Sequence, residues 1–333
     1  ASGNSPRGRF GGPGFDGMLT DMSEIVRPSR DGIHGRELIG TAVDIGGKPM
    51  HLSFDKQGNL SGQTPEMFTI QVPFIFDLPP GNLGSESLHR VLEETSRNID
   101  TLTCIDADSV TKLGLDLPNV VPVLDISDAS QTGRFPNSRM IEISSWDRDA
   151  FEQARLSTDS VIGVRIEFVE GWQDSLTEAV RSGATVIHLL ANLHGEDRQG
   201  RFVTDLFKEA HLLLIEQGRR DLVTLIGSGG IVGADHVPKA IISGMDAVAL
   251  DLPVLFAVQG RVNGSMRDRV EVSGSLPKKF NHPWSVQRLT NLCGSWRDQL
   301  LEILGAMGIR EVRRLRGEFG RSMIVKHLED EAF

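Results

Sequence analysis

The chain has 333 residues and an acidic balance, with 45 Asp and Glu against 35 Lys and Arg and a formal net charge of −10. Nucleic-acid binding needs a surplus of basic side chains to neutralise phosphates, so this charge argues against a nucleic-acid partner. No stretch approaches the ~20 consecutive apolar residues of a membrane-spanning helix. Cys104 and Cys293 are too few for an iron–sulfur cluster and give no disulfide framework, which favours a reducing, cytoplasmic setting.

The first 67 residues differ in composition from the rest of the chain. Residues 1–30 are rich in Gly, Pro and Arg and are predicted to form a flexible or partner-bound arm. Residues 31–67 carry two hairpin signals, "IGGK" at 45–48 and "KQGN" at 56–59. We therefore expect a small β-rich lead-in that closes the bottom of the domain that follows.

From residue 68 to residue 262, short apolar runs alternate with amphipathic stretches. Apolar strands that are each followed by a helix indicate a parallel sheet covered by helices, and about eight such units predict a (β/α)8 barrel. An open, doubly wound sheet is the alternative, but its usual GxGxxG turn is missing from "LPPGNLGSES" after the first strand. The predicted strands cover 68–76, 102–106, 119–127, 140–145, 160–168, 184–192, 222–230 and 245–251.

Residues 263–333 are predicted to form a helical extension after the barrel. Apolar positions at helical spacing predict a long helix over 282–308, with Gly308 as its stop. A second helix is predicted over 309–319. The basic stretch 310–321 would then be a solvated helix face or a surface for a partner.

The segment 212–250 carries the most specific pattern of the chain. A helix ends in Arg-Asp, a strand runs into Ser-Gly-Gly-Ile, and Gly-Ala-Asp precedes a strand with Asp-Ala-Val. This pattern resembles the FMN-binding barrel domain of glutamate synthase, with fainter similarity over roughly residues 68–320. The resemblance implies that the loops after the last two strands hold the FMN phosphate, with Ser228, Gly229 and Gly230 as cofactor-binding residues.

Several positions depart from the resembled family. Asp251 belongs to the same predicted cofactor site, but it stands where the family has a small residue, and its carboxylate would repel a phosphate. Ser144 stands where the family has a lysine near the flavin. The stretch after the last strand lacks the three cysteines that the family often uses for an iron–sulfur cluster. The loop of His194, Glu196 and Asp197 is charged instead of Gly-rich, and we favour an exposed polar loop over a metal or acid–base cluster.

Two readings remain open for Arg165, in "GVRIEF". It offers a fixed positive charge to a flavin or an acidic ligand, as a cofactor-binding residue, or it forms a buried ion pair with Glu142 on the adjacent strand. Four aspartates at predicted strand ends suggest an acidic barrel top, which suits a cationic ligand or a metal or is inert. They are Asp77, Asp106, Asp125 and Asp251.

Two functions of different classes follow. The first is an FMN-dependent oxidoreductase subunit that acts on an amino-acid-like substrate and takes electrons from a partner protein. The second is a flavin-free barrel that serves as a structural or regulatory subunit of a larger complex. A barrel adapted to another anionic or metal-bound ligand is a weaker third option. The sequence assigns no catalytic residue and no metal site.

Overall fold

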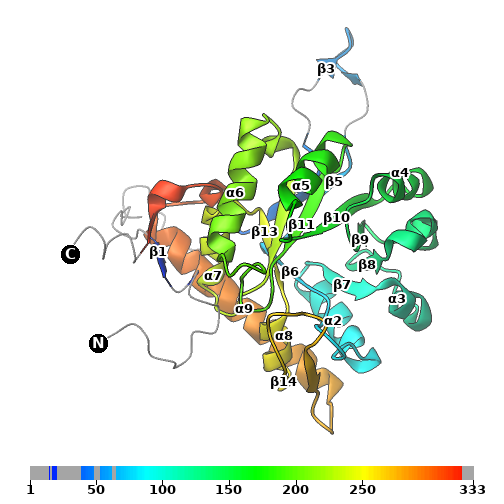
Figure 1. The fold of residues 1–333 in the computed structure, drawn as a ribbon, viewed down its shortest axis with the longest axis vertical. Coiled ribbons are helices and arrows are strands. Elements are labelled where there is room, and N and C mark those ends of the chain that lie inside the picture. The colour runs from blue at the N-terminus through cyan, green and yellow to red at the C-terminus, as the bar shows by residue number, and fades with distance from the viewer. Residues whose placement is uncertain (1–14, 16, 21–38, 49–52, 62–64, 325–333) are drawn as a thin grey trace.

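The computed structural model describes residues 15, 17–20, 39–48, 53–61 and 65–324. Its centre is a closed barrel of eight parallel strands in sequence order, with helices on the outside (Figure 1). The predicted (β/α)8 barrel is confirmed, and the open doubly wound sheet is wrong, because the last strand pairs with the first. The strands are β6 (Phe74–Phe76), β7 (Thr103–Asp106), β8 (Val120–Leu124), β9 (Met140–Ile143), β10 (Val161–Glu167), β11 (Val186–Leu190), β12 (Thr224–Ser228) and β13 (Ala247–Leu250).

The helices between the strands bury one apolar face each against the barrel. Ser85 caps the first of them, since its hydroxyl accepts a hydrogen bond from the Leu88 N–H at 3.2 Å. The helices around the barrel are α2 (Glu86–Asn98), α3 (Ala107–Leu113), α4 (Arg148–Ser157), α5 (Trp172–Arg181), α6 (Val203–Glu216), α7 (His236–Ile242) and α8 (Leu252–Ala257), with a 3₁₀ helix over Ile126–Arg134 after β8.

The predicted strand 68–76 is two strands. Its first part belongs to β5 (Met67–Ile70), which pairs antiparallel with β2 (Val43–Gly46). The N–H of Gly46 donates to Thr224 Oγ1 at 3.2 Å, which places this pair against the N-terminal end of β12. The β2–β5 ribbon therefore lies at the bottom of the barrel.

The two hairpin signals have different outcomes. The "KQGN" signal is confirmed, because β3 (Ser53–Phe54) pairs antiparallel with β4 (Leu60–Ser61) around it. The strand at "IGGK" is β2, and in the described residues it pairs with β5 instead of with a strand directly after the turn. The hairpin predicted at "IGGK" is therefore wrong.

The long C-terminal helix is confirmed as α9 (His282–Ala306), and Gly308, with φ of 70°, follows its end. It packs lengthwise against α2 and also against α8 (Figure 1). Neither α9 nor another helix in the described ranges is long and apolar enough to cross a membrane.

The second C-terminal helix, predicted over 309–319, is wrong. The chain forms two short 3₁₀ helices instead, Val312–Leu315 and Phe319–Arg321. Arg316 turns inward and donates to Asp246 Oδ1 at 2.9 Å, and Gly317 adopts a positive φ of 73° that regular helix does not allow. Part of the basic stretch is therefore anchored to the barrel.

Most of the predicted arm 1–30 lies outside the described residues, but Phe15 is buried against the barrel. Its ring stacks on His236 with centroids 5.2 Å apart, and its carbonyl accepts from Lys239 Nζ at 3.0 Å. Beyond it, β1 (Met18–Thr20) pairs antiparallel with β16 (Ser322–Ile324), so segments from opposite ends of the sequence lie side by side.

Candidate functional site

The C-terminal ends of the barrel strands converge on one arginine. Arg269, from the loop between the paired strands β14 (Arg261–Asn263) and β15 (Ser273–Ser275) that follow α8, donates to Ser228 Oγ at 2.7 Å and to the Ala191 carbonyl at 2.9 Å. The same guanidinium lies 3.3 Å from Asp77 Oδ2 and 2.9 Å from Asp251 Oδ2. We call Asp77, Ser228, Asp251 and Arg269 the mouth cluster, because together they fill the centre of the barrel mouth.

A second set of polar side chains lies below, inside the barrel. Arg165 forms ion pairs with Asp77 and, at 3.4 Å, with Glu142 Oε2. Glu142 Oε1 lies 3.0 Å from His188 Nδ1, and Cys104 Sγ lies 3.7 Å from Glu142 Oε2. We call Cys104, Glu142, Arg165 and His188 the interior cluster. All four are at most 5% exposed.

Burial and neighbouring charges shift the pKa values of Asp77 and Asp251 in opposite directions. Burial would raise the pKa of Asp77, but Arg165 and the other nearby positive charges outweigh it and hold that pKa well below its usual range. Burial raises the pKa of Asp251 above its usual value, and Arg269 only partly offsets this. Burial also raises the pKa of the Cys104 thiol, and the charge of Glu142 adds to the rise. Both effects favour the protonated thiol over the thiolate.

The glycine corner after β12 is a tight turn packed by a neighbouring loop. Gly229 and Gly230 have φ of 109° and 71°, which favour glycine. A Cβ on Gly229 would lie 2.5 Å from the Asn192 carbonyl oxygen, and a Cβ on Gly195 would lie 3.2 Å from Gly230 Cα. Packing against the β11–α6 loop therefore requires glycine at these positions, whether or not they also bind a cofactor.

The residues at the mouth do not fit FMN in this arrangement. A cavity of about 110 Å³ lies at the mouth beside Ala191 and Arg269, whereas ligand sites of this kind usually offer about 300 Å³ or more. Ser228, which the resemblance implies lies beside the cofactor phosphate, accepts a hydrogen bond from the Arg269 guanidinium. Behind that guanidinium stand two buried carboxylates, Asp77 and Asp251, which would face the phosphate if Arg269 left.

The structure brings together three of the five predicted cofactor residues. Ser228 and Asp251 meet at Arg269, and Gly229 directly follows Ser228. Gly230 belongs to the packed turn, where His236 Nδ1 lies 3.2 Å from its carbonyl oxygen. Arg165 lies deeper and forms the ion pair with Glu142 that was one of its two readings.

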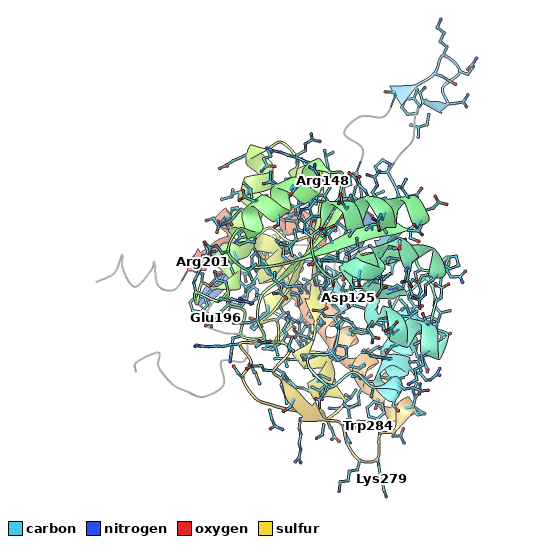
Figure 2. All side chains as sticks on the ribbon, turned by 45° about the vertical axis from the view of Figure 1, so that its right-hand side comes forward. Asp125, Arg148, Glu196, Arg201, Lys279 and Trp284 are labelled. Carbon is cyan, nitrogen blue, oxygen red and sulfur yellow. The ribbon has the colours of Figure 1, made fainter. Side chains whose placement is uncertain are left out.

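The other predicted polar positions do not join the mouth cluster, although Glu196 and Asp197 line the mouth cavity beside Arg269. Asp106 is exposed and caps α3, and Asp125 is exposed on the surface, well apart from Glu196 (Figure 2). His194 is exposed, while Asp197 pairs with Arg201 at 2.8 Å. The predicted acidic top is therefore confined to Asp77 and Asp251, and both are neutralised by arginine.

The sequence did not point to Arg269, His188 or Glu142 as members of one site. Arg269 lies in an irregular loop without a motif, and His188 sits inside an otherwise apolar strand. A polar residue at an inward position of a buried strand is a signal that could have identified His188, because such residues need a partner inside the barrel.

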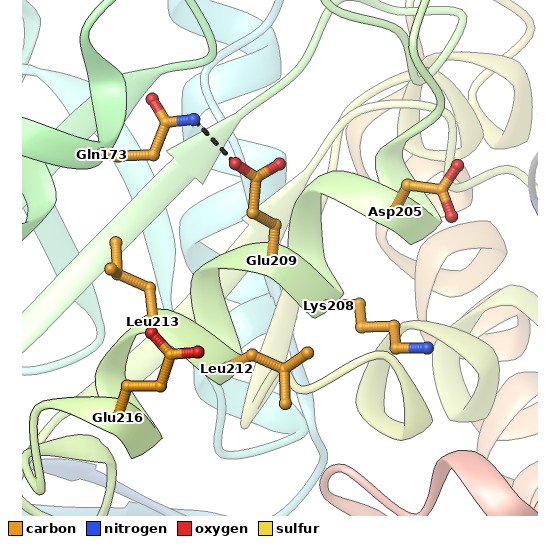
Figure 3. Close-up of a pocket in the computed structure, with 7 residues that line it drawn as sticks. All are labelled: Gln173, Asp205, Lys208, Glu209, Leu212, Leu213 and Glu216. Carbon is orange, nitrogen blue, oxygen red and sulfur yellow. Dashed lines mark hydrogen bonds between the residues drawn. The ribbon is translucent and has the colours of Figure 1, made fainter.

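A larger groove lies on the outside of the molecule, between α5 and α6 (Figure 3). It has a volume of about 420 Å³, and Gln173 Nε2 donates across it to Glu209 Oε1 at 2.7 Å. Helix residues line it, not strand ends, so it is not the site that the barrel fold predicts for a cofactor.

Comparison with solved structures shows proteins that share this fold. A mandelate oxidase variant with a monooxide FMN adduct superposes with a TM-score of 0.54 at 12% identity, covering 92% of this chain and 89% of that one. A flavocytochrome b2 variant with pyruvate bound gives a TM-score of 0.56 at 13% identity, covering 98% and 83%. These likenesses establish the barrel fold that FMN enzymes also use.

Sequence comparison shows which proteins are related to this chain. An archaeal-type glutamate synthase [NADPH] of Dehalococcoides mccartyi is 22% identical over 91% of this chain and 73% of that protein. The archaeal glutamate synthase [NADPH] of Methanocaldococcus jannaschii is 33% identical over 32% of this chain and 22% of that protein. No family model matches the chain. The chain is therefore a distant homologue of the archaeal-type glutamate synthases over most of its length, which confirms the resemblance seen in the sequence.

Proposed function

We propose that this chain is a glutamate-synthase-like barrel that has lost FMN and serves as a structural or regulatory subunit of a larger complex. The observation that carries the proposal is the position of Arg269. It bridges Asp77, Ser228 and Asp251 at the corner where the resemblance implies a phosphate. The Arg269 guanidinium, a cation of the chain itself, therefore already binds the groups that would otherwise lie beside a cofactor phosphate.

The energetics of exchange also support the proposal. An incoming phosphate would first have to displace Arg269 and leave Asp77 and Asp251 short of a counter-charge. Separating Arg269 from its partners costs roughly 1–3 kcal/mol, because Asp77 keeps its ion pair with Arg165. The phosphate would then meet the two carboxylates, and like charges a few ångströms apart repel by about 4 kcal/mol at an intermediate dielectric.

Two sequence departures point the same way. Ser144 removes the lysine that the resembled family places near the flavin, and the chain after β13 has no cysteines at the family's cluster positions. Loss of the flavin would make all of these positions free to change. Protein partners fit this role because a barrel whose mouth is filled has its outer surface left for binding.

A second candidate is an FMN-dependent oxidoreductase subunit, with an amino-acid-like substrate and electrons from a partner protein. One observation favours it: Arg269 belongs to a loop and not to a barrel strand, and its side chain is 19% exposed. Withdrawal of this loop would uncover Ser228, Gly229 and Gly230 without unfolding the barrel. Arg165 would then be a fixed cation below the cofactor.

Visible absorption after incubation with FMN and desalting separates the two candidates. We expect the wild-type chain to emerge colourless, because the mouth cluster occupies the site. Retention of about one FMN per chain by the wild type would overturn the flavin-free proposal in favour of the second candidate.

Two variants sharpen the test. Arg269→Ala combined with Asp251→Gly removes the bridging cation and one carboxylate, and we expect this double variant to gain measurable FMN binding. Arg267→Ala is the matched control, since Arg267 is exposed in the same loop. Equal FMN binding by the double variant and the control would show that Arg269 is not what closes the site.

A further inference from the structure

His188 carries a buried nitrogen with no partner. Its side chain is 0% exposed inside the barrel, and Nε2 has no hydrogen-bond partner among the described residues. Buried polar atoms in proteins are nearly always paired, so an unpaired one indicates a group that completes it. The inference from His188 does not depend on whether the mouth cluster excludes FMN.

The opposite side of the same ring pairs with a carboxylate. His188 Nδ1 lies 3.0 Å from Glu142 Oε1, and an ionised carboxylate only accepts hydrogen bonds. Nδ1 therefore donates to Glu142, and Nε2 is the ring nitrogen left without a hydrogen-bond partner in the described residues. A carboxylate behind a histidine, with the far nitrogen free to donate its lone pair, is the arrangement that orients histidines bound to metals.

Two further donor groups lie close to the same ring. Cys104 Sγ and an oxygen of Asp77 lie with a ring nitrogen of His188 so that all three atoms are within 4.8 Å of one another, and all three residues are buried. They come from β7, from the residue after β6 and from β11, so the closed barrel fixes their separation. Ligand atoms of a tetrahedral zinc ion lie about 3.3–3.7 Å apart, so the three atoms would have to approach one another by up to about 1 Å when the ion binds.

We propose that the barrel interior binds one divalent transition-metal ion of the zinc class through His188 Nε2, Cys104 Sγ and the Asp77 carboxylate. A mixed sulfur, nitrogen and oxygen donor set is typical of zinc and of its substitute cobalt. Magnesium and calcium, which take oxygen ligands, do not fit this set. Because no donor reaches solvent, the site is a structural one that joins three barrel strands.

The charges of the surrounding groups favour a divalent cation. Three buried carboxylates, Asp77, Glu142 and Asp251, face two guanidinium groups, those of Arg165 and Arg269. A divalent ion that replaces the thiol proton of Cys104 adds one net positive charge and leaves this group of residues neutral. Asp77 would then be shared between the ion and both arginines, which ties the metal to the closed mouth.

Because all three donor groups are buried, a bound ion should be protected from a chelator until the chain unfolds. The full-length, untagged chain is produced in minimal medium with zinc, washed with a strong chelator, and then unfolded in guanidinium chloride. We expect about one zinc ion per chain to resist the chelator and to be released only on unfolding. A wild-type chain that releases no zinc after either treatment overturns the proposal.

Cobalt supplies a signature that does not depend on any variant. Protein produced with cobalt in place of zinc should show a near-ultraviolet thiolate-to-cobalt charge-transfer band together with visible bands of tetrahedral cobalt. Bound cobalt without the charge-transfer band would exclude Cys104 as a ligand and overturn the site as assigned. This measurement stands even if a variant at Cys104 fails to fold.

The two cysteines give a matched pair of variants. Cys104→Ser and His188→Gln should each lose the chelator-resistant ion, at least tenfold below the wild type. Cys293→Ser should keep it, because Cys293 is equally buried but lies in α9. Retention by Cys104→Ser, or loss by Cys293→Ser, contradicts the assignment.

Discussion

The two ends of the barrel each bury charged residues, but they pair them differently. At the base, Arg220 donates to the Val223 and Gly244 carbonyls, to His211 Nδ1 and to Asp246 Oδ2. We call Arg220, His211, Asp246 and Arg316 the base cluster, and none of its buried side-chain atoms lacks a partner in the described residues. In the mouth and interior clusters three buried atoms have no hydrogen-bond partner, namely His188 Nε2, Arg165 Nη1 and Asp251 Oδ2, although the last two lie in ion pairs.

The base cluster is fully paired and stabilises the fold, whereas the interior cluster keeps a buried atom that a ligand could bind. Asp246 accepts hydrogen bonds from Arg220, from Arg316 and from the Leu225 N–H. These bonds connect the start of β13 to β12 and to the C-terminal segment. In (β/α)8 barrels the base serves stability, whereas the strand ends at the mouth carry ligands. A fully paired base beneath an incompletely paired interior agrees with that division.

The largest expected effect comes from breaking the base cluster. Asp246→Ala leaves Arg220 buried without its counter-charge and removes the acceptor of the Leu225 N–H. We expect the free energy of unfolding, measured by urea titration, to fall by about 3–5 kcal/mol. Asp221→Ala is the control, because Asp221 is 88% exposed although it also pairs with Arg316; it should cost less than about 1 kcal/mol. Equal losses would mean that burial does not distinguish the two partners.

A smaller effect is expected at the mouth. Arg269→Ala should cost roughly 1–3 kcal/mol in urea unfolding, because Asp77 keeps Arg165 and the pKa of Asp251 is already raised by burial, so this carboxyl can take up a proton. Adding Asp251→Asn to Arg269→Ala should recover part of that loss, since the orphaned carboxylate is removed. A double variant as unstable as the sum of the two single variants would show that Arg269 and Asp251 are not coupled.

The sequence predicted the barrel well because each strand is nearly all apolar and each helix has its own periodicity. It failed where long-range polar contacts override local pattern. The arginines of 310–321 suit a helix by spacing, but Arg316 is drawn to Asp246, which lies 70 residues earlier in the chain. The predicted strand 68–76 splits because its first half pairs with β2, a contact that no local pattern encodes.

The candidate site was predictable only in part. The Ser-Gly-Gly corner and Asp251 lie at strand ends, where barrel topology places a site, and the Arg165–Glu142 ion pair follows from adjacent strands. Arg269 reaches the mouth from a loop beyond α8, and only the folded loop brings its guanidinium to Asp251. His188 and Cys104 were hidden because metal-ligand spacing along a sequence does not reveal donors that come from separate strands of a closed barrel.

The smallest expected effect concerns His211, which is one of several buried histidines and faces the opposite charge to His188. His188 lies against a carboxylate, whereas His211 lies against Arg220, and burial followed by Arg220 and Arg316 lowers the pKa of His211 to about 4. The unfolded chain, with a histidine pKa near ~6.5, therefore binds more protons than the folded chain between these two values. The stability from neutral His211 is complete above the higher value and is lost as pH falls from about 6.5 towards 4.

This contribution can be measured by comparing variants across pH. We expect His211→Gln, whose side-chain oxygen still accepts from Arg220, to remove roughly 1–2 kcal/mol of the pH dependence of unfolding between pH ~7 and ~4.5. The comparison is the difference in slope between wild type and variant, since carboxylates elsewhere titrate equally in both. An unchanged slope would show that His211 is protonated without penalty, and the base cluster would then be less tightly paired than its hydrogen bonds indicate.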